Sequence, residues 1–378
     1  MKPGIGNHEY AARQQKARVL MEKNNLSALL VTEPTNLFYF TGASYFGEMS
    51  FPRPAVLIMP REEKSILITH DFHLQIDWNG ELREYRKVGE MPIEIVKKAF
   101  EEIGCKMGQV GAELGREQRL GISYQDFIKM QDALPAISFV DAADIFWQLR
   151  MVKSEAEIAI ITEACRIQDS IFKRTFEAVE SGMTTQEIKN LFQRVIIESD
   201  ADFGWVIVCI GDYDFRQAAG SSRPDLRLKK SDLLWVDLGV VMNGYHTDYC
   251  RAMVPAGASS SQLEKWGKIH KILEAGVEAA IPGIPSSDLY RVQINTAEKL
   301  NIDMTSWPAQ RFGHGSGLHT TEPPYISLDD DTILEPGMIL HIEPGCIEKD
   351  GIYVLEEQVL VTESGSNVLS LAPWELQT

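Results

Sequence analysis

The segment 233–254 carries two aspartates whose spacing could hold a metal ion. It reads LLWVDLGVVMNGYHTDYCRAMV, in which two apolar runs flank Asn243-Gly244, the dipeptide most typical of a two-residue β-hairpin turn. With this turn, Asp237 and Asp248 lie on the same face of the hairpin as diagonal neighbours. Two carboxylates that point the same way repel each other unless a positive charge lies between them. An isolated pair is more often one strand-end and one solvated aspartate, so a metal site requires further ligands.

His314 is the candidate nitrogen ligand. It lies in RFGHGSGLHTTEPP, where glycines on either side let the backbone approach closely and leave the imidazole unobstructed. The run GHGSG resembles a phosphate-binding loop only superficially, because the glycine spacing is different and the lysine is missing. We therefore interpret this segment as a source of an imidazole ligand.

Two glutamates complete the candidate set. The runs MILHIEPG and GIYVLEEQVLVT are predicted to form a second hairpin, with Asp350-Gly351 as its turn. In that register Glu343 and Glu356 share a face, whereas Glu357 points away, because side chains alternate along a strand. Glutamates in strands are usually solvated, so each gains significance only from the others.

Together these residues are four carboxylates and one imidazole: Asp237, Asp248, His314, Glu343 and Glu356. Four carboxylates neutralise the charge of two divalent ions, and oxygen-rich ligation with one nitrogen suits Mn²⁺, Co²⁺, Fe²⁺ or Zn²⁺. Two such ions, about 3.5–4 Å apart, hold a water between them and generate a hydroxide nucleophile at neutral pH. The set therefore predicts a dinuclear centre that hydrolyses a carbonyl compound.

Length and composition set the frame for this centre. With 378 residues the chain exceeds a single hydrophobic core, so two domains are expected. The net charge of -17 argues against nucleic-acid and anionic-membrane partners. The five cysteines are odd in number and scattered, which favours reduced thiols, and the amino-terminal residues lack an apolar targeting segment. We expect a cytoplasmic protein.

The first half predicts an α/β domain, residues 1–150. A helical pattern at 8–24 precedes four short apolar runs that are typical of strands: SALLVTE, LFYFTGA, PAVLIMP and KSILITH. A helix at 93–103, a strand at 109–113 and a helix at 124–134 follow.

The second half, residues 151–378, predicts an α+β domain in which helices alternate with strands that return as hairpins. Three pairs of residues have the spacing of a helix-starting capping box: Ser154 with Glu157, Thr184 with Glu187, and Ser261 with Glu264. The corresponding helices are expected to end near residues 182, 197 and 281, and another helix is expected at 287–300.

The motifs VDLG…GYHTDYCR, GHGSGL…EPP, HIEPG and LEEQVLVT resemble, in order and spacing, those of the M24 metallopeptidases: aminopeptidase P, prolidase and their relatives. LFYFTG is similar to part of the creatinase-type amino-terminal domain. The resemblance covers nearly the whole chain. It implies a homodimer with a "pita-bread" catalytic domain at 151–378 and a smaller creatinase-like α/β domain at 1–150.

The resemblance also implies roles for the five candidate ligands. Asp237 would bind one metal ion, Asp248 and Glu356 would bridge both ions, and His314 and Glu343 would complete the other site. Glu343 would in addition act as general base on the bridging water. Mn²⁺ is the first choice of metal.

The chain departs from the prolyl-cleaving members at three positions. Thr321 stands where they place a histidine seven residues after the ligand histidine. Gly220 and Val354 replace a histidine and an arginine, respectively. His319 could substitute for the missing histidine, and Thr321 can donate one hydrogen bond but carries no charge. Glu343, His319 and Thr321 are therefore the candidate catalytic residues.

These departures leave two substrate classes open. The first expectation is an Xaa-Pro dipeptidase or aminopeptidase that acts on a short peptide. The alternative is a small zwitterion, because the family also includes creatinase, ectoine hydrolase and a dimethylsulfoniopropionate lyase. Arg216, Arg223 and His246 are candidates for a rebuilt pocket. Metal-free binding homologues of this fold form a third class, against which the five ligand residues argue.

Overall fold

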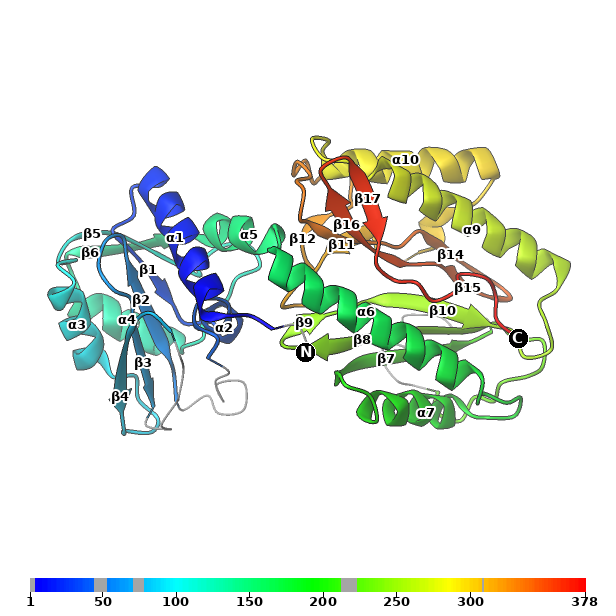
Figure 1. The fold of residues 1–378 in the computed structure, drawn as a ribbon, viewed down its shortest axis with the longest axis horizontal. Helices are drawn as coiled ribbons and strands as arrows, with labels where there is room; N and C mark the ends of the chain where they lie inside the picture. Colours follow the sequence, from blue (N-terminus) through cyan, green and yellow to red (C-terminus); the bar gives the residue numbers. More distant parts are fainter. Residues whose placement is uncertain (1–3, 44–52, 71–77, 212–222, 308) are drawn as a thin grey trace. The chain divides into compact units, whose positions relative to one another are not determined.

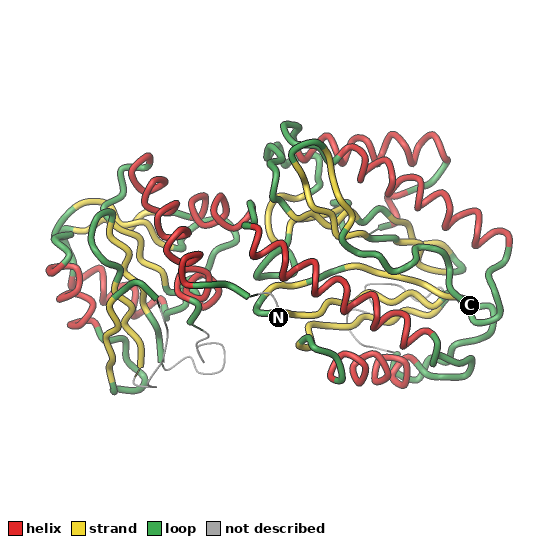
Figure 2. Tube along the Cα trace, in the orientation of Figure 1, coloured by secondary structure: helices red, strands yellow, loops and turns green. Residues whose placement is uncertain are grey.

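The computed structural model describes residues 4–43, 53–70, 78–211, 223–307 and 309–378. The chain divides into two compact units, one formed by Ile5–Arg150 and the other mainly by Met151–Thr378. Each unit contains both helices and β-sheet (Figure 1). Figure 2 shows the same view coloured by secondary structure, with helices packed on the sheets of each unit.

A six-stranded mixed sheet, ordered β4-β3-β2-β1-β5-β6, forms the centre of the first unit. Its strands are β1 (Ala28–Val31), β2 (Val56–Pro60), β3 (Ile66–His70), β4 (Glu81–Tyr85), β5 (Gly108–Ala112) and β6 (Ile137–Asp141). The helices are α1 (Asn7–Lys23), α2 (Pro34–Thr41), α3 (Ile93–Glu102), α4 (Tyr124–Ala133) and α5 (Ala143–Met151). The strand β1 pairs antiparallel with β2 and parallel with β5. The helices predicted at 93–103 and 124–134 and the strand predicted at 109–113 are confirmed to within one residue at each end.

The run LFYFTGA is not the strand that its composition predicts. Most of it lies in helix α2, which begins where the Glu33 side chain accepts a hydrogen bond from the Asn36 backbone N–H. Pro34 occupies the first turn, and Gly42 ends the helix in the left-handed conformation (φ 69°). Most of α2 is buried, and a short apolar run does not distinguish a buried helix from a buried strand.

The described residues of the second unit include four long helices and a short 3₁₀ turn. They are α6 (Glu155–Phe176), α7 (Thr185–Ile197), α9 (Ser260–Ala279), α10 (Ser286–Leu300) and η2 (Met304–Ser306). The two capping boxes predicted at the starts of α6 and α7 are confirmed. The end predicted for α6, near residue 182, is wrong, because the helix stops at Phe176.

The start predicted for α9 is also wrong. Ser259 and Gln262 form its capping box, so the helix begins before the predicted pair, Ser261 and Glu264. Three successive serines offer alternative caps, and glutamine can take the place of glutamate in the box. The sequence alone does not decide among these starts.

The strands of the second unit form two antiparallel sheets and a hairpin. One sheet is ordered β10-β8-β7 with β9 beside β8, the other is β12-β11-β13-β16-β17, and β14 pairs with β15. The first sheet contains β7 (Asp202–Ile210), β8 (Leu234–Met242), β9 (Tyr245–His246) and β10 (Tyr249–Met253). The second contains β11 (Gly313–Gly315), β12 (Glu322–Tyr325), β13 (Ile339–Ile342), β16 (Glu357–Thr362) and β17 (Gly365–Val368). The hairpin comprises β14 (Gly345–Glu348) and β15 (Gly351–Val354).

The first hairpin register is confirmed. Met242 pairs with Tyr245 across Asn243-Gly244, and Asp237 pairs with Cys250, as the turn dipeptide predicts. Both turn residues have positive φ, 49° and 83°, which a two-residue turn of this type requires.

The pairing register of the second hairpin is shifted by two residues from the predicted register, because the turn lies one residue earlier in the chain. Glu348 pairs with Gly351, so the turn is Lys349-Asp350 and not Asp350-Gly351. A shift of two residues preserves which side chains share a face, whereas a shift of one would invert them. The pairing breaks between β13 and β14 and again between β15 and β16, and the acidic residues Glu343 and Glu356 lie at these two breaks.

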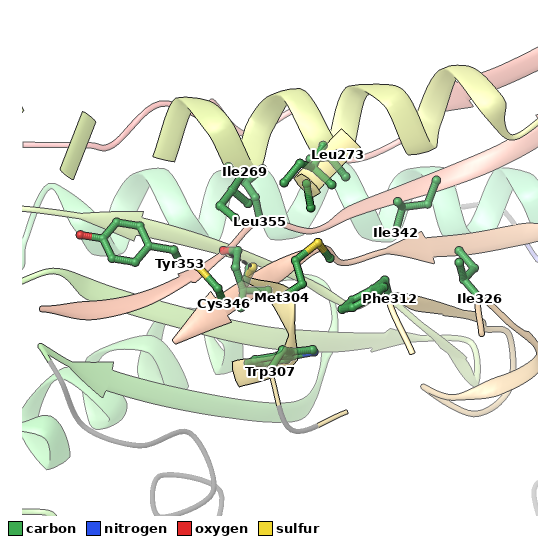
Figure 3. Close-up of a cluster of buried hydrophobic side chains, with 14 of the residues drawn as sticks. Ile269, Leu273, Met304, Trp307, Phe312, Ile326, Ile342, Cys346, Tyr353 and Leu355 are labelled. Atoms are coloured by element: carbon green, nitrogen blue, oxygen red, sulfur yellow. Dashed lines mark hydrogen bonds between the residues drawn. The ribbon is translucent and has the colours of Figure 1, made fainter. Parts of the chain in front are cut away.

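A large hydrophobic core underlies the second sheet, the β14–β15 hairpin and α9. Figure 3 shows Ile269 and Leu273 of α9 among residues from the sheet, the hairpin and the segment around η2. Helix α9 contacts β13, β15 and β17, while α6 contacts β8 and β9, and α7 contacts β7. The strands that carry the acidic residues are therefore fixed by helices packed on them.

Candidate metal centre

The structure gathers the acidic residues and the histidine from segments far apart in the sequence. Asp237 lies within β8, and Asp248 lies between β9 and β10. His314 is the middle residue of β11. Glu343 follows β13, and Glu356 precedes β16.

The side chains lie close enough to share cations. His314 Nε2 is 3.4 Å from Asp248 Oδ2 and 3.9 Å from Glu343 Oε1. The charges of Asp248, Asp237 and Glu343 all act on Glu356, in that order of size. We call Asp237, Asp248, His314, Glu343 and Glu356 the carboxylate cluster. Four of them are buried, and the Glu343 side chain is 13% exposed.

Burial and mutual repulsion make the charged state of this cluster costly. Burial raises the pKa of Asp237 well above its usual value, and the charges of Asp248 and Glu343 raise it further. Burial also raises the pKa of Glu356, again reinforced by its acidic neighbours. For Asp248 and Glu343, burial raises the pKa while the nearby His314 lowers it. Cations placed among the carboxylates would reverse this penalty.

Two carboxylate oxygens of the cluster test whether metal ions fit. Asp237 Oδ1 and Glu356 Oε1 are buried, and within the described part of the chain neither has a hydrogen-bond partner. Buried polar atoms are normally satisfied, so each unmatched oxygen requires an explanation. Divalent ions are bound by carboxylate oxygens, and these two oxygens are free to act as ligands. The donor set therefore fits oxygen-rich divalent metal ligation.

Glu357 points away from the cluster, as strand alternation predicts. Both of its carboxylate oxygens accept hydrogen bonds from Arg251 Nη2, each at 2.9 Å. Arg251 Nη1 also donates to the main-chain oxygen of Glu356 at 2.9 Å and to that of Cys250 at 2.8 Å. The guanidinium thus fastens β10 to the start of β16, on the far side of the backbone from the cluster.

His341 is a site residue that the sequence reasoning missed. Ligand atoms of Asp248, His341 and Glu356 all lie within 4.8 Å of one another. The strand run H-I-E contained the signal, because His341 and Glu343 are two residues apart and share a face. Both ring nitrogens of His341 have hydrogen-bond partners, however, which sets it apart from a metal ligand.

Comparison with known proteins now identifies the family. Residues 159–363 match metallopeptidase family M24, and residues 13–152 match the creatinase/prolidase N-terminal domain. The chain belongs to metallopeptidase family M24. The predicted resemblance and fold class are confirmed, and with them the assignment as a metal-dependent hydrolase.

Several M24 relatives span nearly the whole chain. The Xaa-Pro dipeptidase of Pyrococcus furiosus is 26% identical over 366 residues, covering 96% of this chain and 99% of its own. The prolidase of Thermococcus sibiricus has a TM-score of 0.83 at 25% identity, covering 98% and 100% of the two chains. The N-terminal domain of a FACT complex subunit from chickpea also has a TM-score of 0.78, at 16% identity, covering 98% of both chains. Because proteins of such different description share the fold, the function must be argued from the site.

The two other candidate catalytic residues, His319 and Thr321, lie in the loop before β12. The Thr321 side chain is exposed, and within the described residues it has no hydrogen bond. His319 is half-buried, and its backbone N–H donates to Glu322 Oε1 at 2.9 Å. His246 lies beside this loop, since its Nδ1 is 3.1 Å from the Thr320 hydroxyl. Burial, followed by the nearby His319, lowers the pKa of His246 to about 4.

The remaining departures from the prolyl-cleaving pattern, Gly220 and Val354, and the pocket candidates Arg216 and Arg223 fall in different surroundings. Val354 is fully buried at the end of β15. Arg223 is exposed, with its Nε 3.7 Å from Asp225 Oδ1. Gly220 and Arg216 lie outside the described residues.

No described helix of this chain has the length and apolar character needed to cross a membrane.

Proposed function

We propose that the protein is a dinuclear metal-dependent peptidase that cleaves Xaa-Pro bonds, most simply in dipeptides. The observation that carries this proposal is the buried cluster of four carboxylates and one imidazole, with two carboxylate oxygens unmatched. The Pyrococcus furiosus protein, which is similar to this chain over almost its whole length, is named an Xaa-Pro dipeptidase. Its name supports an Xaa-Pro substrate.

Each cluster residue has a role in this proposal. Asp237 would hold one ion, Asp248 and Glu356 would bridge two, and His314 and Glu343 would complete the second site. Bound divalent ions would lower the pKa of a shared water and polarise the scissile carbonyl. Glu343 would take a proton from the attacking water and pass it to the leaving nitrogen. Its partial exposure is consistent with such a role, since a general base must reach water.

Arg311 supports a substrate with a free carboxylate. Its Nε lies 3.8 Å from Glu343 Oε1, and its guanidinium is 5.3 Å from the ring centroid of Tyr325. The side chain is 27% exposed, so it can meet a ligand that enters the site. A guanidinium binds carboxylates in a bidentate geometry. A dipeptide carries its carboxylate on the proline itself, close to the bond that is cut.

Further parts of the proposal concern properties beyond the cluster. We propose Mn²⁺ as the native metal, a homodimer as the assembly and the cytoplasm as the location. His319 and Thr321 are proposed to contact the substrate from the loop before β12. The creatinase-like domain would comprise 1–150 and the catalytic domain 151–378, in line with the two compact units.

A substrate panel tests this function. Purified protein that has been stripped and reloaded with Mn²⁺ should bind close to two ions per chain and hydrolyse Xaa-Pro dipeptides. Creatine, ectoine and dimethylsulfoniopropionate serve as the competing small zwitterions. Activity on one of these with no activity on any dipeptide would overturn the proposed substrate, and the absence of bound metal would overturn the centre.

A further inference from the structure

A row of buried polar side chains lies behind the carboxylate cluster. Cys165 of α6 is 3.1 Å from Gln358 of β16, measured from Sγ to Oε1. Gln358 Nε2 is 3.4 Å from the Ser316 hydroxyl, and that hydroxyl is 2.7 Å from His341 Nε2. His341 Nδ1 is then 2.5 Å from the main-chain oxygen of Asp248. All four side chains are completely buried.

The direction of every hydrogen bond in this row follows from the acceptor at its end, the main-chain oxygen of Asp248. A carbonyl oxygen only accepts, so His341 must carry its hydrogen on Nδ1. In a neutral imidazole Nε2 then accepts, which makes Ser316 the donor to it. The Ser316 oxygen is left to accept from the Gln358 amide, whose own oxygen accepts from the Cys165 thiol. All four donors point toward Asp248, and aligned hydrogen bonds of this kind strengthen one another.

The geometry points to His341 as a positioning residue for the bridging carboxylate of Asp248. His341 would orient this carboxylate by donating a hydrogen bond from Nδ1 to the main-chain oxygen of Asp248. The hydroxyl of Ser316 would select the required tautomer by donating to Nε2. This inference rests on the proposed metal centre. Asp248 lies in the two-residue gap between β9 and β10, next to Thr247, whose N–H donates to the main-chain oxygen of Val240 at 3.0 Å. The bond from His341 adds a restraint on the Asp248 carbonyl from β13, the strand that also leads to Glu343.

The same contacts distinguish His341 from a metal ligand. Its Nδ1 is 3.6 Å from Glu356 Oε1 but only 2.5 Å from the Asp248 carbonyl oxygen. A ligand nitrogen must offer a lone pair, and the lone pair of Nε2 faces the Ser316 hydroxyl. His341 therefore acts on the metal site as a hydrogen-bond donor to Asp248 and not as a ligand.

The tautomer can be measured directly on the metal-free full chain. In protein labelled with ¹⁵N-histidine, the ring signals of His341 are assigned by their loss in His341→Asn. We expect a protonated Nδ1 and an unprotonated Nε2. A protonated Nε2 would overturn the inference, and this outcome does not depend on whether the chain binds metal.

Paired substitutions then test the effect on the metal site. Asparagine places an N–H where Nδ1 lies, whereas glutamine places one where Nε2 lies. We expect His341→Gln to weaken Mn²⁺ binding by about 10–100-fold and His341→Asn to retain most of the affinity. Ser316→Ala, which leaves the bond to Asp248 intact, should lose less than His341→Gln. Equal affinity of the glutamine and asparagine variants would contradict a role for the Nδ1 hydrogen.

A matched control separates this effect from a general loss of structure. His270 lies on α9 with its ring stacked on Trp374 at 3.5 Å between centroids, outside the row. His270→Asn should leave Mn²⁺ affinity and the His341 tautomer unchanged. If the unsubstituted protein bound no divalent metal, the proposed function would fail, and the tautomer would still show whether the hydrogen-bond row exists.

Discussion

Glu113 in the first unit and the carboxylate cluster in the second are buried acidic groups with opposite surroundings. In the first unit Glu113 is buried among hydrogen-bond donors. In the second unit four carboxylates lie together, and two of their oxygens meet no donor within the described residues. Burial is the largest influence on the pKa in both places. What differs is the next largest influence on the pKa, which is hydrogen-bond donors at Glu113 and neighbouring negative charges at Glu356. This difference separates a structural carboxylate from a functional one.

Glu113 is satisfied by the protein itself. It accepts hydrogen bonds from the backbone N–H and hydroxyl of Thr32, both at 2.9 Å, from the backbone N–H of Glu33, and from Asn36 Nδ2 at 3.0 Å. These donors oppose the effect of burial, and the pKa of Glu113 is raised to about 7. The carboxylate thereby ties β5 to the start of α2.

The carboxylate cluster is satisfied only in part by the described residues of the chain, because two of its buried oxygens meet no donor there. Like charges add to the effect of burial at Asp237 and Glu356, where donors oppose it at Glu113. The general lesson is that a buried acid with donors maintains the fold. A group of buried acids that repel one another, with too few donors among the described residues for all of their oxygens, instead favours bound cations.

The largest effect is expected from removing the proposed base. Glu343→Gln keeps the shape of the side chain and an oxygen ligand but cannot accept the proton, so kcat should fall by about 10²–10⁴-fold. At saturating Mn²⁺ the metal content should change little, because the glutamine amide oxygen can still act as a ligand. Steady-state kinetics beside metal analysis would check this, and a variant with normal kcat would remove Glu343 from the mechanism.

A smaller effect is expected at Arg311, the cation beside the cluster. Arg311→Gln should lower kcat/KM for Xaa-Pro dipeptides by about 10–100-fold, the value of one charge-assisted hydrogen bond. The loss should appear mainly in KM. For the matching dipeptide amides, which lack the carboxylate, the two proteins should differ little. Equal losses on both substrate series would show that Arg311 serves the centre and not the substrate.

In the first unit the corresponding substitution should affect folding and not rate. Glu113→Gln turns an amide group toward backbone donors, which should cost about 1–3 kcal/mol of unfolding free energy. Because the pKa of Glu113 is raised to about 7 in the folded state, folding binds a proton. Its contribution to stability is therefore full below about pH 4.5 and is lost as the pH rises toward 7.

Urea unfolding of both full-length proteins between pH 4.5 and 8 would check that sign. The stability of the unsubstituted protein relative to Glu113→Gln should decrease as the pH rises through this window. The kcat of the two proteins should agree at every pH. A difference that grows with pH would mean that the donors outweigh burial at this carboxylate.

The smallest expected effect has the opposite sign. In metal-free protein, Glu356→Gln removes one charge from a repelling cluster, so the unfolding midpoint at pH 8 should rise by about 2–4 °C. With Mn²⁺ present the same variant should lose the stabilisation that metal gives to the unsubstituted protein. Differential scanning calorimetry with and without metal would measure both. A lower midpoint in metal-free Glu356→Gln would place Glu356 with Glu113 among the structural acids.

Much of the fold follows from short-range signals. The capping boxes at Ser154 and Thr184 were predictable because each device acts within three residues. The Asn243-Gly244 turn fixed the register of the first hairpin for the same reason. Failures occurred where two local solutions were close in energy, as with the successive serines before α9 and the aromatic run in α2.

For the site, the sequence predicted five candidate ligands and the faces that they share. The period of two along a strand is set by backbone geometry, so it survived even the error in the second turn. Only the tertiary structure decided which buried oxygens lack donors, and which groups stand behind them. His341 and Arg251 could not be assigned roles from sequence, because their partners come from distant segments brought together by burial of the core.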